Sequence, residues 1–160
     1  MSGLDALYSE IILDHYRSPH GAGLREPFDG QSHQVNPLCG DEITLRVTLG
    51  DHAGLVADVS YEATGCSISQ ASASMLHDLV AGEPVARAAQ RLAGVRRMLV
   101  DGEEPDEELL EDAIAVAGVA RFPARVKCAL LPWAAFTDAM ARAGVTVRDN
   151  QPDPTDQESS

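Results

Sequence analysis

Apolar residues near the start of the chain recur at the spacing of a helix. Leu7 and Ile11 are four residues apart, and their apolar neighbours fall on the same side of a helix that would span residues 4–17. A proline and two glycines follow directly and end that helix. Residues 18–38 should then be irregular, because prolines and glycines punctuate them, although a short strand around residues 32–35 is compatible with the pattern.

The next segment alternates apolar and polar side chains, which is typical of strands with one buried face. Residues 42–49 form the first such run, and residues 55–63 form the second. The glycine-containing residues 50–54 between them suit a turn, so we expect the two strands to pair as an antiparallel hairpin. The side chains expected to face inward are Ile43, Leu45, Val47 and Leu49 on the first strand, and Leu55, Ala57, Val59, Tyr61 and Ala63 on the second.

Helical spacing returns in the second half of the chain. Helices are predicted from residue 67 or 69 to about 80, over residues 85–99, over residues 106–117, and from residue 123 to about 143. Ser67 or Ser69 can cap the first of these helices, and Pro123 suits the first turn of the last. Pro132 lies inside the last helix and should kink it or break it locally.

The order of these elements predicts an α+β fold. One helix precedes a small antiparallel sheet of about three strands, and several helices follow and pack with it. A chain of 160 residues suits one domain, which we place at residues 1–146. Residues 147–160 carry mostly acidic and polar side chains, so we expect them to form a disordered acidic tail.

The charge balance limits the possible partners. The chain has 12 basic and 25 acidic residues and a net charge of −13, so it should repel nucleic-acid phosphates and anionic membranes. No apolar run is long enough to span a membrane, and the N-terminus lacks the features of a secretory signal. We therefore expect a cytoplasmic protein that binds neither nucleic acid nor membranes.

The chain contains three cysteines, each near a boundary between predicted elements. Cys39 lies just before the first strand of the hairpin, Cys66 lies between the second strand and a helix, and Cys128 lies near the start of the last helix. An odd number of cysteines suits metal binding or thiol chemistry in a reducing compartment better than a disulfide framework. Gly40 permits a turn that can aim Cys39 and Asp41 at one point.

Three thiolates and one carboxylate suit a tetrahedral zinc ion. Such a site keeps a net negative charge, which Arg125 and the chain's single lysine, Lys127, could offset. These cations near Cys128, and the helix N-terminus at Cys66, should favour the thiolate forms. The spacing alone leaves other interpretations open: each cysteine could be a small buried apolar residue, Asp41 could stabilise a turn, and the cations could simply be solvated.

Three sequence motifs resemble those of a known family. They are NPLCGD at residues 36–41, GCSISQASAS at residues 65–74 and FPARVKCA at residues 122–129. In this order, they resemble the three cysteine motifs of the SufU branch of the IscU-like family, and residues 7–19 resemble that family's first helix. The similarity extends over about residues 4–143. Three separate motifs in register make the resemblance specific.

Two features favour the SufU branch over the scaffold branch of this family. Scaffold members carry a histidine directly before the third cysteine, and Lys127 occupies that position here. SufU-type members carry extra residues between the second and third motifs, and the stretch around residues 82–105 resembles that insertion.

The resemblance implies that Cys39, Asp41, Cys66 and Cys128 bind Zn²⁺. It also implies a partner, a SufS-like pyridoxal-phosphate-dependent cysteine desulfurase, which removes sulfur from cysteine and carries it as a persulfide. In the family mechanism a desulfurase histidine displaces one zinc–cysteine bond, and by motif position Cys39 would then accept the sulfur. We assign catalytic roles to Cys39, as this acceptor, and to Arg125, as a positive charge beside the site. The sulfur would pass to a downstream iron–sulfur scaffold complex.

Two other functions remain open on the sequence. The same four residues could hold a [2Fe–2S] cluster, which would make the chain an assembly scaffold, although Lys127 in place of the histidine counts against this function. A purely structural zinc site is the other, but a core of this size should fold without a metal.

Overall fold

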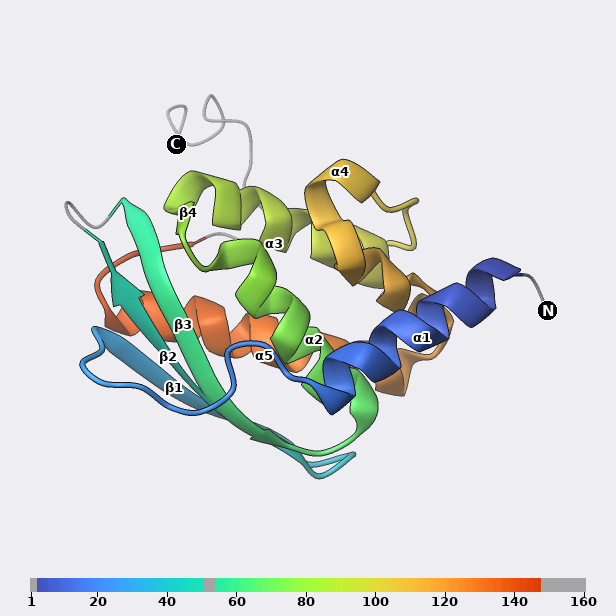
Figure 1. Ribbon diagram of the computed structural model, residues 1–160, viewed down its shortest axis with the longest axis horizontal. Helices are drawn as coiled ribbons and strands as arrows, with labels where there is room; N and C mark the ends of the chain where they lie inside the picture. The colour runs from blue at the N-terminus through green and yellow to red at the C-terminus, as the bar shows by residue number, and fades with distance from the viewer. Residues whose placement is uncertain (1–2, 51–53, 148–160) are drawn as a thin grey trace.

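A four-stranded antiparallel sheet forms one side of the molecule (Figure 1). The computed structural model describes residues 3–50 and 54–147 of the chain. The strands pair in sequence order, β1 (Gly30–Asn36), β2 (Asp41–Leu49), β3 (Leu55–Thr64) and β4 (Glu83–Pro84). The α+β class and the β2–β3 hairpin are as predicted. The two-residue β4, which pairs with the start of β3, adds a short fourth strand to the three expected.

The inward side chains predicted for the start of β3 are wrong. Leu55 and Ala57 are exposed there, and Val56 is buried instead. The reason is an irregularity beside Thr48 and Leu49, where the pairing of β2 with β3 shifts by one residue. A shift of one residue turns every following side chain to the opposite face of a strand. Past this bulge the predicted alternation holds.

Two long helices cover the inner face of the sheet (Figure 1). α5 (Pro123–Arg142) packs along β1 and β2, and α2 (Ser67–Val80) packs against α5 and β3. Their apolar sides and the inner face of the strands form the core. Among its largest fully buried side chains are Leu45, Tyr61, Met75, Leu76, Trp133 and Phe136. This packing holds the first turns of both helices near the loop between β1 and β2.

Proline has two different effects on α5. Pro123 occupies the first turn, as predicted, where the missing N–H would have no partner within the helix. The break expected at Pro132 is absent, because α5 continues through this residue to Arg142. Pro132 is buried against the rest of the fold. Packing of the whole helix therefore offsets the loss of one backbone hydrogen bond.

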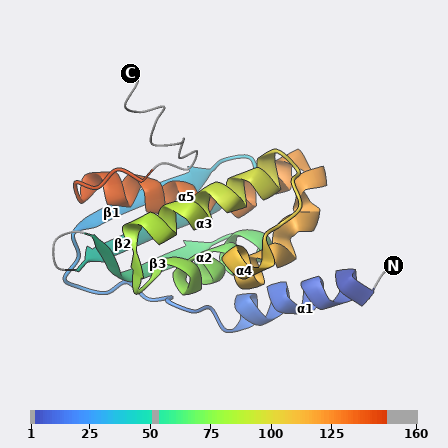
Figure 2. The ribbon, with the colours of Figure 1, turned by 90° about the horizontal axis from the view of Figure 1, so that it is seen from above.

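The remaining helices lie on the far side of α2 and α5 from the sheet (Figure 2). They are α1 (Gly3–Arg17), α3 (Val85–Val100), α4 (Glu107–Leu110) and η2 (Glu111–Arg121). α1 contacts both α2 and η2, and η2 also contacts α3 and α5. α2 therefore lies between these outer helices and the sheet.

The helix predicted over residues 106–117 has a different form. A single turn of α-helix, α4, is followed by the 3-10 helix η2. At their junction, the φ angle of Glu111 is +48°, so the α-helical hydrogen-bond ladder cannot continue. The Glu111 carboxylate accepts a hydrogen bond of 3.0 Å from Arg91, which is buried on α3. This tertiary contact accompanies the change of helix type.

The end of the chain is described only in part. Residues 148–160 of the predicted disordered tail lie outside the described residues. Val147, the first residue of that predicted tail, is buried and belongs to the apolar core. Within the described residues, none of the helices combines the length and the apolar character needed to cross a membrane.

Candidate metal centre

The fold brings the three cysteine motifs to one end of the sheet. Asp41 is the first residue of β2, and the antiparallel β2–β3 pairing places it beside the end of β3. Cys66 follows β3 directly and is the N-cap residue of α2. Cys39 lies in the tight loop that joins β1 to β2, and Cys128 lies in the second turn of α5. Four side chains that are far apart in sequence therefore share one location.

Short distances connect all four predicted ligands. The sulfur atoms of Cys39 and Cys128 are 3.3 Å apart. Cys39, Asp41 and Cys128 each offer a ligand atom within 4.8 Å of the other two. Cys66 lies outside this tightest group but is adjacent to it, because its Sγ is 3.9 Å from Oδ2 of Asp41. The structure thus brings together every metal ligand that the sequence predicts.

The buried carboxylate of Asp41 tests whether these residues suit a metal ion. Asp41 is fully buried, and its Oδ1 accepts the backbone N–H of Cys66 at 2.9 Å. Among the described residues, Asp41 has no partner of positive charge within ion-pair distance. A buried carboxylate is costly unless a cation compensates it. One carboxylate oxygen beside three sulfur atoms matches the ligands of zinc, so the donor set fits Zn²⁺.

Two glycines make this arrangement possible. Gly40, between two of the ligands, has a φ angle of +72°. Gly65 has a φ angle of +137°, and a Cβ atom at this position would collide with the carboxylate of Asp41. The absence of a side chain at Gly65 therefore leaves the space that Asp41 occupies.

Burial differs sharply among the three thiols. Cys39 is exposed, Cys66 is half-buried and Cys128 is fully buried. Burial is the main cause that raises the pKa of the Cys128 thiol far above its ordinary value, and hydrogen bonding to Asp41, Cys39 and Cys66 adds to this rise. The metal-free protein therefore keeps the Cys128 thiol protonated at neutral pH, and a metal ion must displace that proton when it binds.

The prediction that nearby cations lower the pKa of Cys128 is wrong for the metal-free protein, because burial dominates. Arg125 and Lys127 lie in the first turns of α5 and are both exposed to solvent. Neither forms an ion pair with any described residue. Their side chains therefore remain available to a partner, and the catalytic role of Arg125 stays a prediction.

Sequence reasoning overlooked the role of Asn36. Its side-chain amide donates toward the sulfur of Cys128 at 3.9 Å, and its Oδ1 accepts the backbone N–H of Leu38 at 3.3 Å. Asn36 is buried and therefore both shapes the loop that carries Cys39 and contacts a second cysteine. The sequence did contain one indication of this role. An asparagine at the start of a turn often hydrogen-bonds the backbone two residues further on, and Asn36 stands directly before Pro37.

The serines of α2 form specific hydrogen bonds near the candidate site, but not the helix cap expected of them. Neither Ser67 nor Ser69 caps α2, because Cys66 occupies the N-cap position and no side chain forms a capping hydrogen bond there. Ser69 Oγ instead lies 3.9 Å from the sulfur of Cys66. Ser72 is buried and donates to the backbone oxygen of Ala129 on α5 at 2.6 Å. The Ser72 bond links the two cysteine-bearing helices, whereas the Ser69 contact lies within the first turn of α2.

Comparison with known proteins gives matches over most of the chain. The family described as "NifU-like N terminal domain" matches residues 7–129. The zinc-dependent sulfurtransferase SufU of Bacillus subtilis (strain 168) is 38% identical over 143 residues, which cover 88% of this chain and 94% of that protein. The iron–sulfur cluster assembly scaffold protein IscU of Streptococcus pyogenes serotype M1 is 36% identical over 144 residues, or 89% of this chain and 88% of that protein.

A solved structure extends the similarity to the fold. The crystal structure of a candidate iron–sulfur cluster assembly scaffold protein for the SUF system, from Fervidobacterium islandicum AW-1, superposes with a TM-score of 0.73. It is 33% identical to this chain, and the match covers 86% of this chain and 99% of that one. The similarity of sequence and the similarity of fold therefore each cover more than four fifths of the chain.

Proposed function

Because this chain belongs to the NifU-like N-terminal domain family, which includes the SufU and IscU proteins of iron–sulfur cluster assembly, we propose that it is a zinc-dependent sulfur-transfer protein. It accepts sulfur from a SufS-like, pyridoxal-phosphate-dependent cysteine desulfurase and passes it to a downstream iron–sulfur scaffold complex. The relative named a zinc-dependent sulfurtransferase supports this choice within the family.

Cys39, Asp41, Cys66 and Cys128 are the proposed zinc ligands. Their donor atoms converge, and the buried carboxylate of Asp41 otherwise has no compensating charge among the described residues. Bound zinc would keep the thiols deprotonated at neutral pH and, because it has no redox chemistry of its own, would leave a persulfide intact. Zinc would also prevent the neighbouring thiols of Cys39 and Cys128 from oxidising to a disulfide.

The exposure of Cys39 is the observation that carries the assignment of the sulfur acceptor. Cys128 is fully buried and Cys66 is half-buried, so neither can reach a sulfur atom held on another protein as easily. Cys39 lies on the loop of four residues between β1 and β2. The preceding residue in this loop, Leu38, is 70% exposed. A partner can therefore approach this thiol without disturbing the core.

The proposed transfer is a thiol–persulfide exchange. The Cys39 thiolate attacks the terminal sulfur of the desulfurase persulfide, and a new sulfur–sulfur bond forms on Cys39. The old sulfur–sulfur bond breaks, and its electron pair leaves with the desulfurase cysteine as a thiolate. No external oxidant or reductant is needed, because one persulfide is exchanged for another. The exposed Arg125 would stabilise the negative charge of the persulfide sulfur during this step.

The surface around Cys39 suits a protein partner. A groove of about 350 Å³ lies beside the loop and is lined mainly by apolar side chains, together with Lys127. Val35 and Leu38 on its rim are 51% and 70% exposed. Apolar area of this kind, with a cation beside it, is typical of a contact surface for another protein. We propose that the desulfurase covers this groove when it delivers sulfur.

Persulfide mapping tests the acceptor assignment. The zinc-loaded protein is incubated with a desulfurase and cysteine, its thiols are alkylated, and its peptides are analysed by mass spectrometry. We expect the additional sulfur on the Cys39 peptide in the wild type and its loss in Cys39→Ala. The acceptor is read from the position of the added sulfur in the wild-type peptides, because Cys39→Ala and Cys128→Ala each remove a proposed zinc ligand and should both lower sulfur loading. Wild-type sulfur loading of Cys39→Ala would overturn the assignment.

A second function, that of an assembly scaffold, is favoured by the names of two of the matching proteins. The relative named an assembly scaffold is 36% identical to this chain, and the same sulfur and oxygen donors could hold a [2Fe–2S] cluster. The lysine at position 127 argues for sulfur transfer instead. Anaerobic reconstitution with iron and sulfide separates the two functions. A stable cluster that displaces zinc and transfers to an acceptor protein would favour the scaffold.

A further inference from the structure

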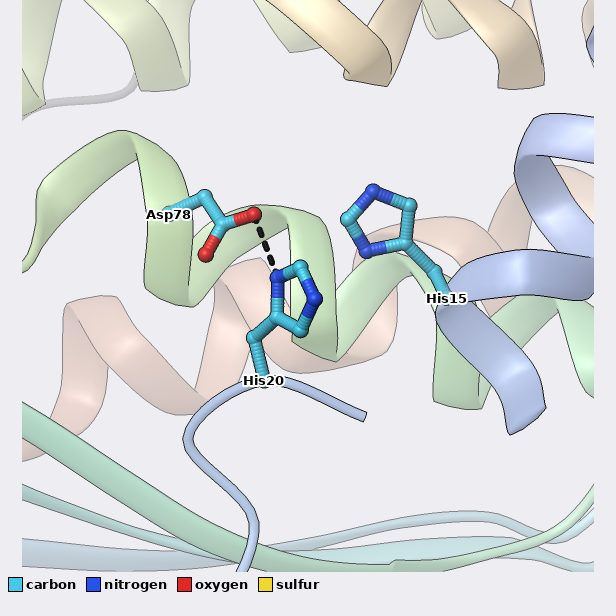
Figure 3. Close-up of side chains that lie close together, drawn as sticks. All are labelled: His15, His20 and Asp78. Carbon is cyan, nitrogen blue, oxygen red and sulfur yellow. Dashed lines mark hydrogen bonds and ion pairs between the residues drawn. The ribbon is translucent and has the colours of Figure 1, made fainter. Parts of the chain in front are cut away.

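A second group of metal-binding side chains lies away from the cysteines. His15 lies on α1, His20 lies on the segment that follows it, and Asp78 lies near the end of α2 (Figure 3). Asp78 is twelve residues beyond Cys66 on the same helix, which places it about 18 Å further along the helix axis. The two groups are therefore separate sites.

The three side chains converge on a small volume. One ligand atom from each of His15, His20 and Asp78 lies within 4.8 Å of the other two. The imidazole rings of the two histidines have their centroids 4.9 Å apart. Figure 3 shows both rings and the carboxylate of Asp78 turned toward a common point between α1 and α2. Small side-chain rotations would bring all three within the bonding distance of one ion.

Hydrogen bonds prepare His15 to act as a ligand. Its Nε2 lies 2.9 Å from a carboxylate oxygen of Asp112, and a carboxylate can only accept, so Nε2 carries the proton. The lone pair of the neutral ring is then on Nδ1, where the hydroxyl of Ser74 donates to it at 2.7 Å. A metal ion at Nδ1 would replace the Ser74 hydroxyl there, while the carboxylate at Nε2 would hold the ring, as is usual for a histidine ligand.

His20 repeats this arrangement. Its Nδ1 lies 2.7 Å from a carboxylate oxygen of Asp78, so Asp78 must give up this hydrogen bond, by rotation of its side chain, to become a ligand beside Nε2 of His20. Its backbone N–H donates to Ser74 Oγ at 2.9 Å, so the same hydroxyl positions both histidines. In Figure 3 the second nitrogen of this ring lies on the side that faces His15. The two imidazoles, each paired with a carboxylate, thus offer ligand atoms to one small volume.

We propose that His15, His20 and Asp78 form a second metal site, which takes a divalent first-row transition ion such as Co²⁺, Zn²⁺ or Fe²⁺. Imidazole nitrogen with carboxylate oxygen selects ions of this class. The site is open, because the side chains of His20 and Asp78 are 50% and 38% exposed, and water can complete the coordination. An adjoining cavity of about 320 Å³, lined by Asp112 and both histidines, gives a hydrated ion access.

The proposed site joins elements that differ widely in sequence position. A bound ion would tie α1 and the segment after it to α2, the helix whose first turn carries Cys66. The cysteine site is partly buried and rich in thiolates, whereas this one is half-exposed and holds only nitrogen and oxygen donors. We therefore expect the second ion to bind more weakly and to exchange more readily than the first.

Cobalt titration tests this proposal. Full-length protein without a histidine tag is first loaded with one equivalent of zinc, and Co²⁺ is then added. We expect one further equivalent to bind, with ligand-field absorption bands but without a sulfur-to-cobalt charge-transfer band. The ring signals of His15 and His20 should show paramagnetic shifts in NMR spectra. His20→Ala and Asp78→Asn should each weaken the binding of this Co²⁺ at least about tenfold.

His33→Ala is the matched control. His33 is 51% exposed and lies 3.0 Å from the carboxylate of Glu42, so it resembles His20 in exposure and pairing but stands outside the proposed site. We expect it to bind Co²⁺ as the wild type does. Circular dichroism confirms that each variant is folded. The proposal fails if no further equivalent binds, if the added Co²⁺ shows the sulfur band, or if His20→Ala binds it unchanged. Loss of binding in His33→Ala would also overturn it.

Discussion

Single buried polar groups distinguish the metal centre from the core. The carboxylate of Asp41 is buried beside sulfur donors, an environment that suits a bound cation. Tyr61 is equally buried, but its hydroxyl has no hydrogen-bond partner among the described residues. The nearby hydroxyl of Ser74 is already engaged with His15 and His20. A buried hydroxyl without a partner carries an uncompensated desolvation cost, so the Tyr61 hydroxyl does not stabilise the fold at neutral pH.

The pKa of Tyr61 leads to a prediction about alkaline stability. Burial is the main cause that raises this pKa from 10.0 to about 12. Between these values the unfolded chain releases the phenol proton while the folded chain keeps it, so the free energy of unfolding falls as pH rises through this window. We expect the free energy of unfolding of Tyr61→Phe to fall less at alkaline pH than that of the wild type. At pH 7 the variant should be at least as stable as the wild type, because it removes an unpaired buried hydroxyl.

Urea unfolding of the wild type and Tyr61→Phe at several pH values measures this difference. Tyr8, which is only partly buried, provides the control variant Tyr8→Phe, for which we expect the alkaline decline of the wild type. An equal decline in the wild type and in Tyr61→Phe would contradict the prediction.

At the scale of elements, the connection between β3 and α2 is the most demanding part of the fold. The chain leaves the sheet at Thr64 and enters α2 at Ser67, so only Gly65 and Cys66 make the turn. Gly65 has a positive φ angle and lies directly against the Asp41 carboxylate. This turn therefore positions one proposed ligand and leaves space for another.

Replacing Gly65 should damage the metal centre more than the fold. Gly65→Ala introduces a Cβ atom where the carboxylate of Asp41 lies, in addition to backbone strain of about 1–3 kcal/mol. We expect a marked loss of zinc affinity, measured by competition with a chromophoric chelator. Gly102→Ala is the control, because Gly102 also has a positive φ angle, of +70°, but open space around it. It should lose comparable stability and retain zinc affinity. Equal zinc affinity in both variants would contradict the account.

The sequence predicted the elements well and their irregularities poorly. Apolar spacing identified α1, α2, α3, α5 and the β2–β3 hairpin, because each of these buries one continuous face. It failed at the bulge beside Thr48, because the register of a strand depends on its partner. It also failed at Glu111, where a contact with the buried Arg91 accompanies an interrupted helix. Local patterns cannot report such tertiary contacts.

At the scale of the whole molecule, the candidate metal centre is a product of the topology. Antiparallel pairing sets Asp41 beside the end of β3, and the packing of α5 on β1 and β2 carries Cys128 to Cys39, 89 positions away in the chain. The positions of the cysteines at element boundaries left this grouping open, and the resemblance of three motifs to a family favoured it. The group of His15, His20 and Asp78 had no such motif, so only the structure could reveal it.

Zinc content and desulfurase activity, measured on the same sample, test the central claim most directly. We expect the protein to hold a zinc ion that is lost in Cys128→Ala, and to increase the turnover of a cysteine desulfurase. Removal of this zinc, or Cys39→Ala, should abolish the increase, because the exposed thiol and its metal are both required for sulfur transfer. An increase that persists without zinc, or without the Cys39 thiol, would contradict the account.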